Sequence, residues 1–218
     1  MSAGLSQRAA TLAHVTSSGL FVSLEGGDGA GKSTQARLLR EWLVAAGREV
    51  VLTREPGGTE LGRLLRDAVL HGEDVDPRTE ALLYATDRAH HVASLVRPAL
   101  ARGAVVVTDR YLDSSVAYQG SGRDLGADEV EALSMWATEG LLPALTVLLD
   151  LDPVLGRSRL TGDPDRLERA GDEFHRLTRE AFLARAAADP GRWLVLDATQ
   201  PPDQLAAAIR ARVEELVA

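Results

Sequence analysis

Residues 24–33 of the sequence read Leu24-Glu25-Gly26-Gly27-Asp28-Gly29-Ala30-Gly31-Lys32-Ser33, and this segment sets the architecture of the chain. An apolar run, Leu20 to Glu25, leads into it, and an amphipathic segment that stops at Gly47 follows it. Glycines between a strand and a helix let backbone N–H groups converge on phosphate oxygens, and the helix N-terminus adds a positive dipole. The segment therefore predicts a phosphate-binding loop, or P-loop.

The side chains of the P-loop have distinct expected roles. Lys32 is expected to neutralise the β and γ oxygens of a nucleoside triphosphate, and the Ser33 hydroxyl to ligate Mg²⁺. A chance glycine-rich turn is the alternative, and it is disfavoured because strand, loop and helix occur together. The residues expected to contact the nucleotide are Gly26, Gly27, Asp28, Gly29, Ala30, Gly31, Lys32, Ser33 and Thr34.

The rest of the chain alternates short apolar runs with longer helical segments. This alternation predicts an α/β fold in which helices cover both faces of a five-stranded parallel sheet. A long helix is expected to begin at Asp76-Pro77 and run toward Val96, and a shorter one to start at Pro98. The predicted strands are Leu20 to Glu25, Val50 to Arg54, Val105 to Asp109, Leu145 to Leu151 and Trp193 to Asp197.

The chain is organised as one domain with two special segments. Residues 19–218 are predicted to form a single domain, because 218 residues fit one hydrophobic core. Residues 1–18 are expected to be a flexible extension. The polar, arginine-rich stretch at about residues 157–170 is expected to be a mobile flap, or LID.

Composition restricts the partners of the protein. The 32 acidic residues outnumber the 24 Lys and Arg, and a net charge of −8 disfavours nucleic acid polymers and anionic membranes. The absence of cysteine excludes disulfides and is compatible with the cytoplasm. No apolar run approaches the roughly 20 residues that span a bilayer. The adjacent His90 and His91 diverge on a helix, so they are assigned no catalytic role.

The end of the third predicted strand carries further chemistry. Asp109 stands where a carboxylate can join a magnesium shell, and Arg110 directs a guanidinium toward the same cleft. A surface ion pair would be the default interpretation if the P-loop were absent. No Asn-Lys-x-Asp segment occurs, so a guanine-specific GTPase is not favoured.

Five segments in order closely resemble the thymidylate kinase family, from Leu20 to Val217. The resemblance implies a P-loop kinase fold that transfers the γ-phosphoryl group of ATP to dTMP, giving dTDP and ADP in dTTP synthesis. It also implies Mg²⁺ as cofactor, a homodimer, and a catalytic set of Lys32, Asp109, Arg110 and Arg166, with Ser33 and Asp109 at the metal. The segments are residues 24–35, Thr53 to Thr59, Leu82 to Arg88, Asp109 to Gly120 and Asp165 to Glu168.

The same resemblance implies the acceptor site. Arg54 and Arg110 would grip the monophosphate, Tyr84 would stack on thymine, and Arg88 would reach a base carbonyl. Tyr84 and Arg88 are four residues apart on a helix and so share a face, although a core tyrosine with a solvated arginine would give the same spacing. The remaining implied contacts are Ser115 and Gln119 at the pyrimidine edge, Tyr118 near the 2′ position and Asp28 near the 3′-hydroxyl, where a local loop-supporting role is the alternative for Asp28.

Family members differ in the source of one catalytic arginine. Some carry it in the P-loop, at the position of Gly29 here, whereas others supply basic residues from the LID. This sequence resembles the second sort, and Arg166 is the preferred candidate because it lies in Asp165-Arg166-Leu167-Glu168. The other LID arginines are Arg157, Arg159 and Arg169, and a solvated helix face is an equal interpretation of Arg157 and Arg159.

Two other functions remain open from the sequence. A nucleoside monophosphate kinase of different base specificity would share the P-loop and Arg110, but it would not explain the Tyr84-to-Arg88 spacing with Gln119. A regulatory protein that binds nucleotides without turnover would share the fold. Intact Lys32, Asp109 and Arg110 argue against it.

Overall fold

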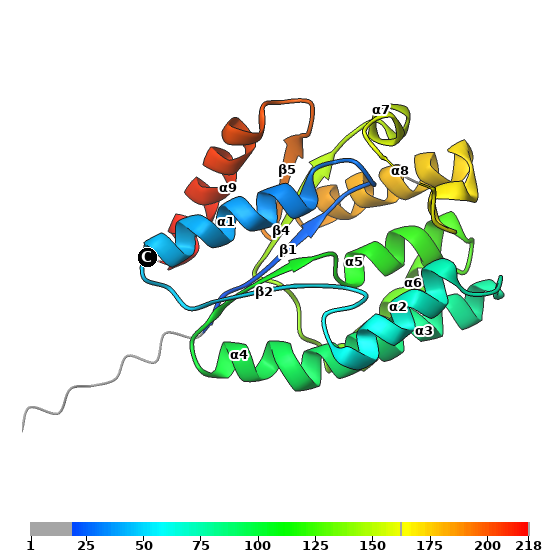
Figure 1. The fold of residues 1–218 in the computed structure, drawn as a ribbon, viewed down its shortest axis with the longest axis horizontal. Helices are drawn as coiled ribbons and strands as arrows, with labels where there is room; N and C mark the ends of the chain where they lie inside the picture. The colour runs from blue at the N-terminus through cyan, green and yellow to red at the C-terminus, as the bar shows by residue number, and fades with distance from the viewer. Residues whose placement is uncertain (1–18, 162, 218) are drawn as a thin grey trace, which may run out of the picture.

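A computed structural model describes residues 19–161 and 163–217. All five predicted strands form one parallel sheet in the order β2-β3-β1-β4-β5, which confirms the α/β prediction (Figure 1). The predicted extension of residues 1–18 lies outside the described residues. The strands are β1 (Phe21–Glu25), β2 (Val50–Arg54), β3 (Val105–Asp109), β4 (Leu145–Asp150) and β5 (Trp193–Asp197).

The strand register brings the polar strand ends to one edge of the sheet. Asp109 pairs with Leu24 on one side and with Arg54 on the other, and Glu25 pairs with Leu148. Ligands of open parallel sheets bind beyond the carboxyl ends of the strands. The sheet therefore places Arg54 and Asp109 side by side where a ligand would bind, with the buried Glu25 on the next strand.

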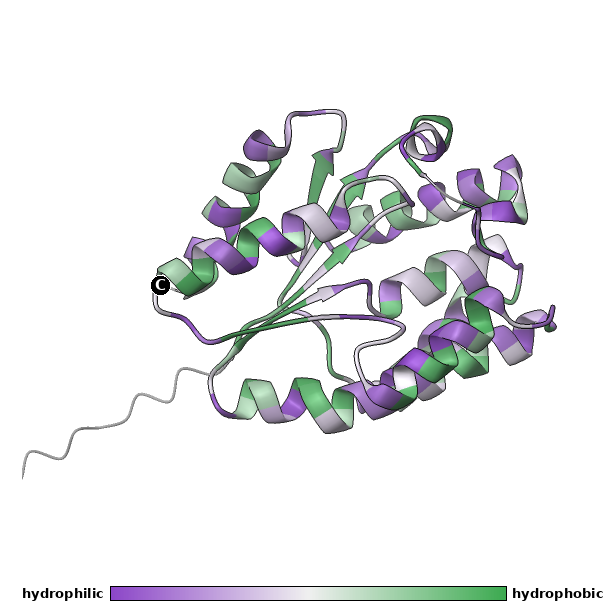
Figure 2. Ribbon diagram, viewed as in Figure 1, coloured by the Kyte–Doolittle hydropathy of each residue, from purple (hydrophilic) through white to green (hydrophobic). Residues whose placement is uncertain are grey.

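Two helices cover one face of the sheet. They are α1 (Lys32–Ala45) and α9 (Pro202–Val217), which pack against each other. Leu39 and Leu43 of α1 and Ile209 of α9 are buried against the strands, and the strands are the most uniformly apolar elements in Figure 2. This core fixes α1, and hence the P-loop before it, against β1.

The remaining helices cover the other face or pack on those that do. Phe21 and Val106 point to this face because side chains alternate along a strand. In chain order the helices are α2 (Glu60–His71), α3 (Pro77–His91), α4 (Arg97–Ala101), α5 (Leu112–Ser115), α6 (Ala127–Thr138), α7 (Pro153–Ser158), the 3₁₀ turn η3 (Glu168–Ala170) and α8 (Asp172–Ala188). Within the described residues, no helix has both the length and the apolar character needed to cross a membrane.

Two π-helical segments were not predicted. The segment η1 (Val92–Val96) joins α3 directly to α4, so the helix continues where a new one was expected to start at Pro98. The wider π turn accommodates the proline, which has no N–H to donate. The second segment, η2 (Val116–Gly122), continues α5 and carries Tyr118 and Gln119. Such segments often occur at functional sites.

The packing of α1 yields a stability prediction. Leu43 is 1% exposed, whereas the adjacent Val44 is 49% exposed. Leu43→Ala should lower the free energy of unfolding by about 3 kcal/mol, because it removes buried apolar contacts and leaves a cavity. Val44→Ala should change it by less than about 0.5 kcal/mol. Urea unfolding followed by circular dichroism measures both, and equal losses would contradict the described orientation of α1.

Candidate active site

The P-loop is shaped by three glycines with positive φ. Gly26 has a φ of 131°, and a Cβ added there would lie 2.4 Å from the carbonyl oxygen of Leu149. Gly31 adopts a left-handed conformation at the start of α1, and no side chain caps the helix. The first N–H groups of α1 are therefore available to an anion.

The Lys32 ammonium lies inside the loop. Its Nζ donates to the carbonyl oxygens of Gly26 at 3.1 Å and Gly27 at 2.8 Å, and it is 4.0 Å from the Asp28 carboxylate. Burial lowers the pKa of Lys32, and the nearby Arg110 charge lowers it further. The loop carbonyls hold this cation next to the N-terminus of α1.

Ser33 and Asp109 form a pair of oxygen ligands beside the loop. The Ser33 hydroxyl donates to Oδ2 of Asp109 at 2.6 Å, and Ser33 is exposed. Mg²⁺ commonly keeps several waters and takes only one or two protein ligands together with substrate phosphates. The pair fits such an ion. Among the described residues no cluster of three or more His, Asp and Glu side chains forms a fuller metal site.

Arg110 connects the P-loop to the elements that follow β3. Its φ is 71°, a left-handed conformation that non-glycine residues seldom adopt, and its N–H donates to the Leu24 carbonyl at 2.9 Å. The guanidinium donates to the carbonyl of Gly26 at 3.0 Å, to Asp28 at 2.5 Å and to the Tyr118 hydroxyl at 3.2 Å. Although burial opposes it, the charges of Arg110 and Lys32 lower the pKa of Asp28 to about 2.

A buried carboxylic group, Glu25, lies directly behind Arg110. Its two oxygens accept from the Tyr111 N–H at 2.8 Å and from the Ser114 hydroxyl at 2.6 Å. Ser114 in turn accepts from Arg110 at 3.1 Å. Burial, with a further contribution from the Asp113 carboxylate, raises the pKa of Glu25 to about 8.

Two hollows open on either side of Arg110. The P-loop hollow, of about 890 Å³, is lined by residues that include Gly29, Lys32, Ser33, Arg54, Asp109 and Arg159. The Tyr84 hollow, of about 520 Å³, is lined by residues that include Tyr84, Arg88, Ser115, Tyr118 and Gln119. The two hollows share Asp28, Glu55, Arg66 and Arg110.

The structure brings the sequence-predicted acceptor residues together, with Arg54 as the exception. The five predicted base and sugar contacts all line the Tyr84 hollow, as do Asp28 and Arg110. Arg54 does not line it. Arg54 is exposed at the end of β2 and lines the P-loop hollow instead.

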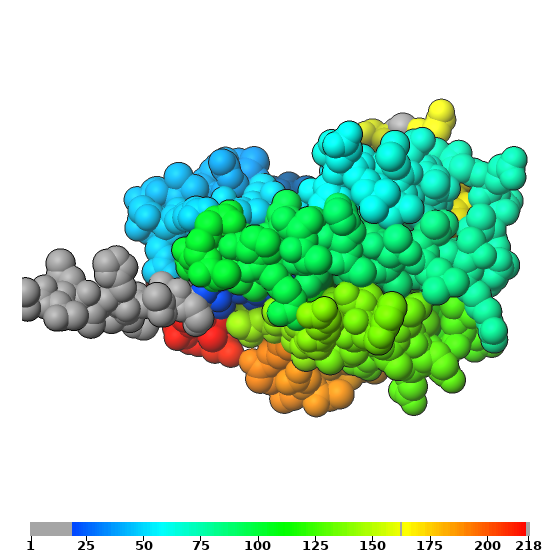
Figure 3. All heavy atoms as spheres, turned by 90° about the horizontal axis from the view of Figure 1, so that it is seen from below, coloured from blue at the N-terminus to red at the C-terminus, as the bar shows by residue number. Residues whose placement is uncertain are grey.

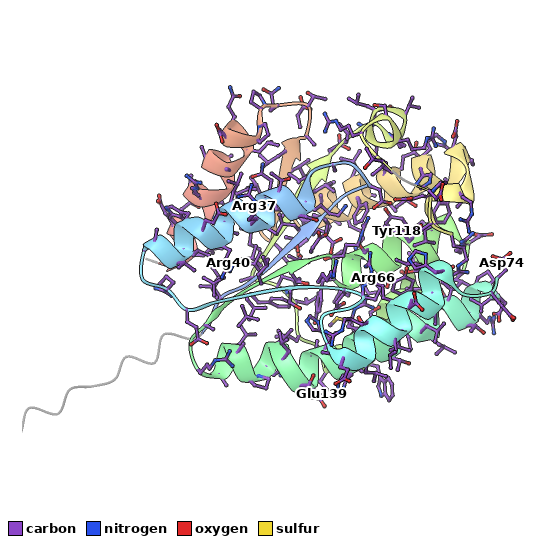
Figure 4. The ribbon with its side chains drawn as sticks, in the orientation of Figure 1. Arg37, Arg40, Arg66, Asp74, Tyr118 and Glu139 are labelled. Atoms are coloured by element: carbon purple, nitrogen blue, oxygen red, sulfur yellow. The ribbon has the colours of Figure 1, made fainter. Side chains whose placement is uncertain are left out.

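Arg66 was not predicted from the sequence as a residue of the site. This residue lies on α2, lines both hollows and donates to the Pro56 carbonyl at 3.1 Å. Arg66 and Tyr118 are both labelled in Figure 4 and reach the Tyr84 hollow from different helices. A sequence signal exists, because the non-polar residues Gly62 and Leu70 lie four positions on either side of Arg66 and so share its face on a helix.

Among the LID arginines, Arg159 lines the P-loop hollow and the preferred candidate Arg166 does not. Arg166 is 8% exposed; it donates to the Val69 carbonyl at 2.8 Å, pairs with Glu80 at 2.9 Å, and does not line the P-loop hollow. The reason is the buried Glu80 carboxylate, which needs a cation nearby. Arg159 lines the P-loop hollow and donates to the Gly29 carbonyl at 3.3 Å. Arg157 pairs with Asp172 at 2.6 Å.

The helix α7, which leads into the LID, packs on the P-loop through backbone atoms. A Cβ added to Gly29 would lie 2.2 Å from the carbonyl oxygen of Gly156 in α7. No side chain fits at residue 29 in this arrangement. The position that could hold a P-loop arginine is thus closed by α7, the helix that precedes Arg159.

A family model described as thymidylate kinase matches residues 24–209, a range that includes the P-loop and both hollows. The chain belongs to the thymidylate kinase family. This confirms the resemblance inferred from the sequence, and the five-stranded parallel sheet is the fold expected of a P-loop kinase of this family.

Curated relatives named thymidylate kinase cover nearly the whole chain. The protein of Leifsonia xyli is 62% identical over 200 residues, which are 90% of this chain and 95% of that protein. The protein of Clavibacter michiganensis is 60% identical over 204 residues, covering 92% of this chain and 97% of the relative. The protein of Bifidobacterium longum is 57% identical over 203 residues, covering 91% and 98% respectively.

The raised pKa of Glu25 predicts how the free energy of unfolding changes with pH. The folded protein retains a proton on Glu25 up to a pKa of about 8, whereas the unfolded chain releases it near 4.5. Raising the pH from 5 to 8 therefore favours the unfolded wild type, by up to about 1.4 kcal/mol per pH unit. Glu25→Gln removes this dependence, so its free energy of unfolding relative to wild type should rise across that range.

Urea titrations at pH 5, 6, 7 and 8 measure the effect. Glu214→Gln, on an exposed part of α9, is the matched control and should parallel wild type. A Glu25→Gln curve parallel to wild type would contradict a proton held by Glu25.

Proposed function

We propose that this chain transfers the γ-phosphoryl group of ATP to dTMP, giving ADP and dTDP. The observation that carries the proposal is the junction of the two hollows at Arg110, Arg66 and Asp28. A triphosphate on the P-loop would end beside a monophosphate whose base occupies the Tyr84 hollow. Positioning of this kind supplies most of the catalysis in phosphoryl transfer.

On the donor side, the P-loop backbone and Lys32 would hold the β- and γ-phosphates. The N-terminus of α1 points its N–H groups toward that position. Ser33 and Asp109 would hold Mg²⁺, which neutralises charge on the β and γ oxygens when it is bound. The 2.6 Å contact between these two side chains supports a shared ligand.

On the acceptor side, two guanidiniums would hold the monophosphate. Arg66 and Arg110 both line the junction, and each has a planar fork of donors suited to phosphate. Arg54 lines the P-loop hollow, and we assign it to the region where the two phosphates meet. When the monophosphate binds, it would take over Arg110 contacts that Asp28 now holds at 2.5 Å.

Recognition of the base would rest on Arg88 and Gln119. Arg88 donates to Glu55, Ser134, Tyr111 and Ser115, so among the described residues one of its five N–H groups remains for a base carbonyl. Gln119 donates its amide to Glu80 at 2.8 Å, which leaves its oxygen for the N3–H of thymine. Cytosine presents the opposite donor and acceptor pattern at these positions.

The remaining contacts fit a deoxyribonucleotide on a tyrosine platform. Tyr84 lines the hollow and would stack on the base. Tyr118 is held by Arg110 and by an edge-to-face contact with Phe174 at 5.8 Å. We assign Tyr118 to the 2′ position of the sugar, where it would crowd a hydroxyl, and Asp28 to the neighbourhood of the 3′-hydroxyl.

The transfer itself needs no general base. An oxygen of the dTMP phosphate, already anionic, attacks the γ-phosphorus, and the bond from that phosphorus to the β–γ bridging oxygen breaks. Charge on the transferring oxygens would be stabilised by Lys32, Arg110 and, from the LID, Arg159. Arg159 replaces Arg166 in this proposal because it lines the P-loop hollow.

A panel of monophosphates tests the proposal. With ATP and Mg²⁺, we expect dTMP to be phosphorylated at least about a hundredfold more efficiently than dCMP, AMP or GMP, because two base contacts would be lost or reversed. Coupled measurement of ADP release gives kcat/KM for each. Efficient use of another monophosphate with little use of dTMP would contradict the proposal, as would binding of both nucleotides without product.

We also propose that the protein is a cytoplasmic homodimer. Three adjacent helices carry exposed apolar side chains: Leu64 on α2 is 68% exposed, Leu82 on α3 55% and Trp136 on α6 80%. The helix α3 packs against both α2 and α6, and Figure 3 views the side of the molecule on which α3, α4 and α6 lie. An apolar surface of this kind is typical of a protein interface.

Substitution of Trp136 tests the homodimer. Trp136→Glu should place a charge in the interface and shift the protein from dimer to monomer at micromolar concentration. Val44→Glu, on α1 at the opposite face of the sheet, introduces the same charge at an exposed apolar position and should leave the dimer intact. Sedimentation velocity measures both, and a monomeric wild type would contradict the proposal.

A further inference from the structure

A chain of polar side chains lies next to the Tyr84 hollow and ends at Arg88. The Thr53 hydroxyl is 2.7 Å from Nε2 of His91, and Nδ1 of His91 is 2.7 Å from Oε1 of Glu55. The other oxygen of Glu55, Oε2, accepts from Nε of Arg88 at 2.8 Å. His91 is thus two contacts from the guanidinium assigned to the base.

Three of these four side chains are shielded from solvent, and Thr53 is partly exposed. His91 is 0% exposed, Arg88 2% and Glu55 3%. Both oxygens of the Glu55 carboxylate are engaged, one by each neighbour. A carboxylate oxygen that loses its donor here has no bulk water to replace it, so the carboxylate must turn or admit water.

The hydrogen-bonding role of Nδ1 in His91 follows from its partner. An ionised carboxylate can only accept, so Nδ1 must carry a proton and donate to Glu55. The other ring nitrogen, Nε2, is paired with the Thr53 hydroxyl. The two contacts together fix the orientation of the ring.

The loop after β2 is built around this arrangement. A Cβ added to Gly58 would lie 2.5 Å from Oγ1 of Thr53 and 2.7 Å from Nε2 of His91. Only a glycine lets the loop close over these atoms. The same loop follows Arg54, the last residue of β2, which is assigned to the phosphates. The His91 imidazole therefore connects this loop to Arg88, the arginine assigned to the base.

We propose that His91 is a positioning residue for base recognition, which it controls by orienting Glu55 and, through Glu55, Arg88. The inference rests on the proposed function in that the base is taken to occupy the Tyr84 hollow. A histidine that only filled the core would contribute to stability and to the amount of active protein. A positioning histidine changes the KM for dTMP and the discrimination against dCMP.

Three variants separate these roles. His91→Leu removes both hydrogen bonds and should raise the KM for dTMP about tenfold, with kcat and the KM for ATP within about twofold of wild type. The ratio of kcat/KM for dTMP over dCMP should fall about tenfold. His91→Asn keeps an amide N–H near the place of Nδ1 and should recover most of both losses. His90→Leu, at the exposed neighbouring position, is the matched control.

Two further measurements address the role of His91 if His91→Leu is unstable or if dTMP is not the substrate. Thr53→Val removes only the hydroxyl and should raise the KM for dTMP about threefold. Independently of turnover, the Arg88 Nε–H signal in ¹⁵N NMR should exchange slowly in wild type, His90→Leu and His91→Asn, and rapidly in His91→Leu.

The inference would be overturned if His91→Leu and His91→Asn had the same KM for dTMP and the same ratio of dTMP over dCMP. A His91→Leu variant that lowered only kcat would also overturn it. A slowly exchanging Arg88 signal in His91→Leu would also overturn it. A wild type that does not phosphorylate dTMP would refute the proposed function, and the NMR signal would still decide the role of His91.

Discussion

The guanidinium of Arg110 forms hydrogen bonds both to the P-loop and to a side chain that lines the Tyr84 hollow. The arrangement of the site depends on these hydrogen bonds. The guanidinium contacts the Gly26 carbonyl and Asp28 on one side and Tyr118 on the other. A left-handed backbone at Arg110, bonded to Leu24 of the neighbouring strand, sets its direction. The uncommon conformation is maintained by the surrounding sheet and by buried Glu25 behind it.

Buried carboxyl groups recur behind the side chains of the site that donate hydrogen bonds. Glu25 stands behind Ser114 and Arg110, Glu55 behind Arg88, and Glu80 behind Gln119. Each is 3% exposed or less. A buried carboxyl group is costly unless its oxygens are bonded, so each one holds its donor in a narrow range of positions. Fixed donors of this kind can discriminate between substrates without rearranging when these bind.

The local features of this chain were predictable from its sequence, and the long-range ones were not. The strands and the P-loop follow from patterns within a few residues, and the predicted strand ends at Glu25, Arg54 and Asp109 match the structure. The pairing of Arg166 with Glu80 was not predicted, because Glu80 lies on a distant helix and no local pattern reveals it. His91 was dismissed on helical spacing alone, since its contacts to Thr53 and Glu55 come from another element.

The most direct test of the account is the affinity of a compound that joins adenosine and thymidine through five phosphates. If the two hollows meet at Arg110, isothermal titration should show this compound binding at least about a hundredfold more tightly than ATP or dTMP, because one molecule spans both sites. Arg110→Ala should remove most of that gain and change ATP binding little. An affinity no greater than that of ATP, or equal loss of both ligands in Arg110→Ala, would contradict the account.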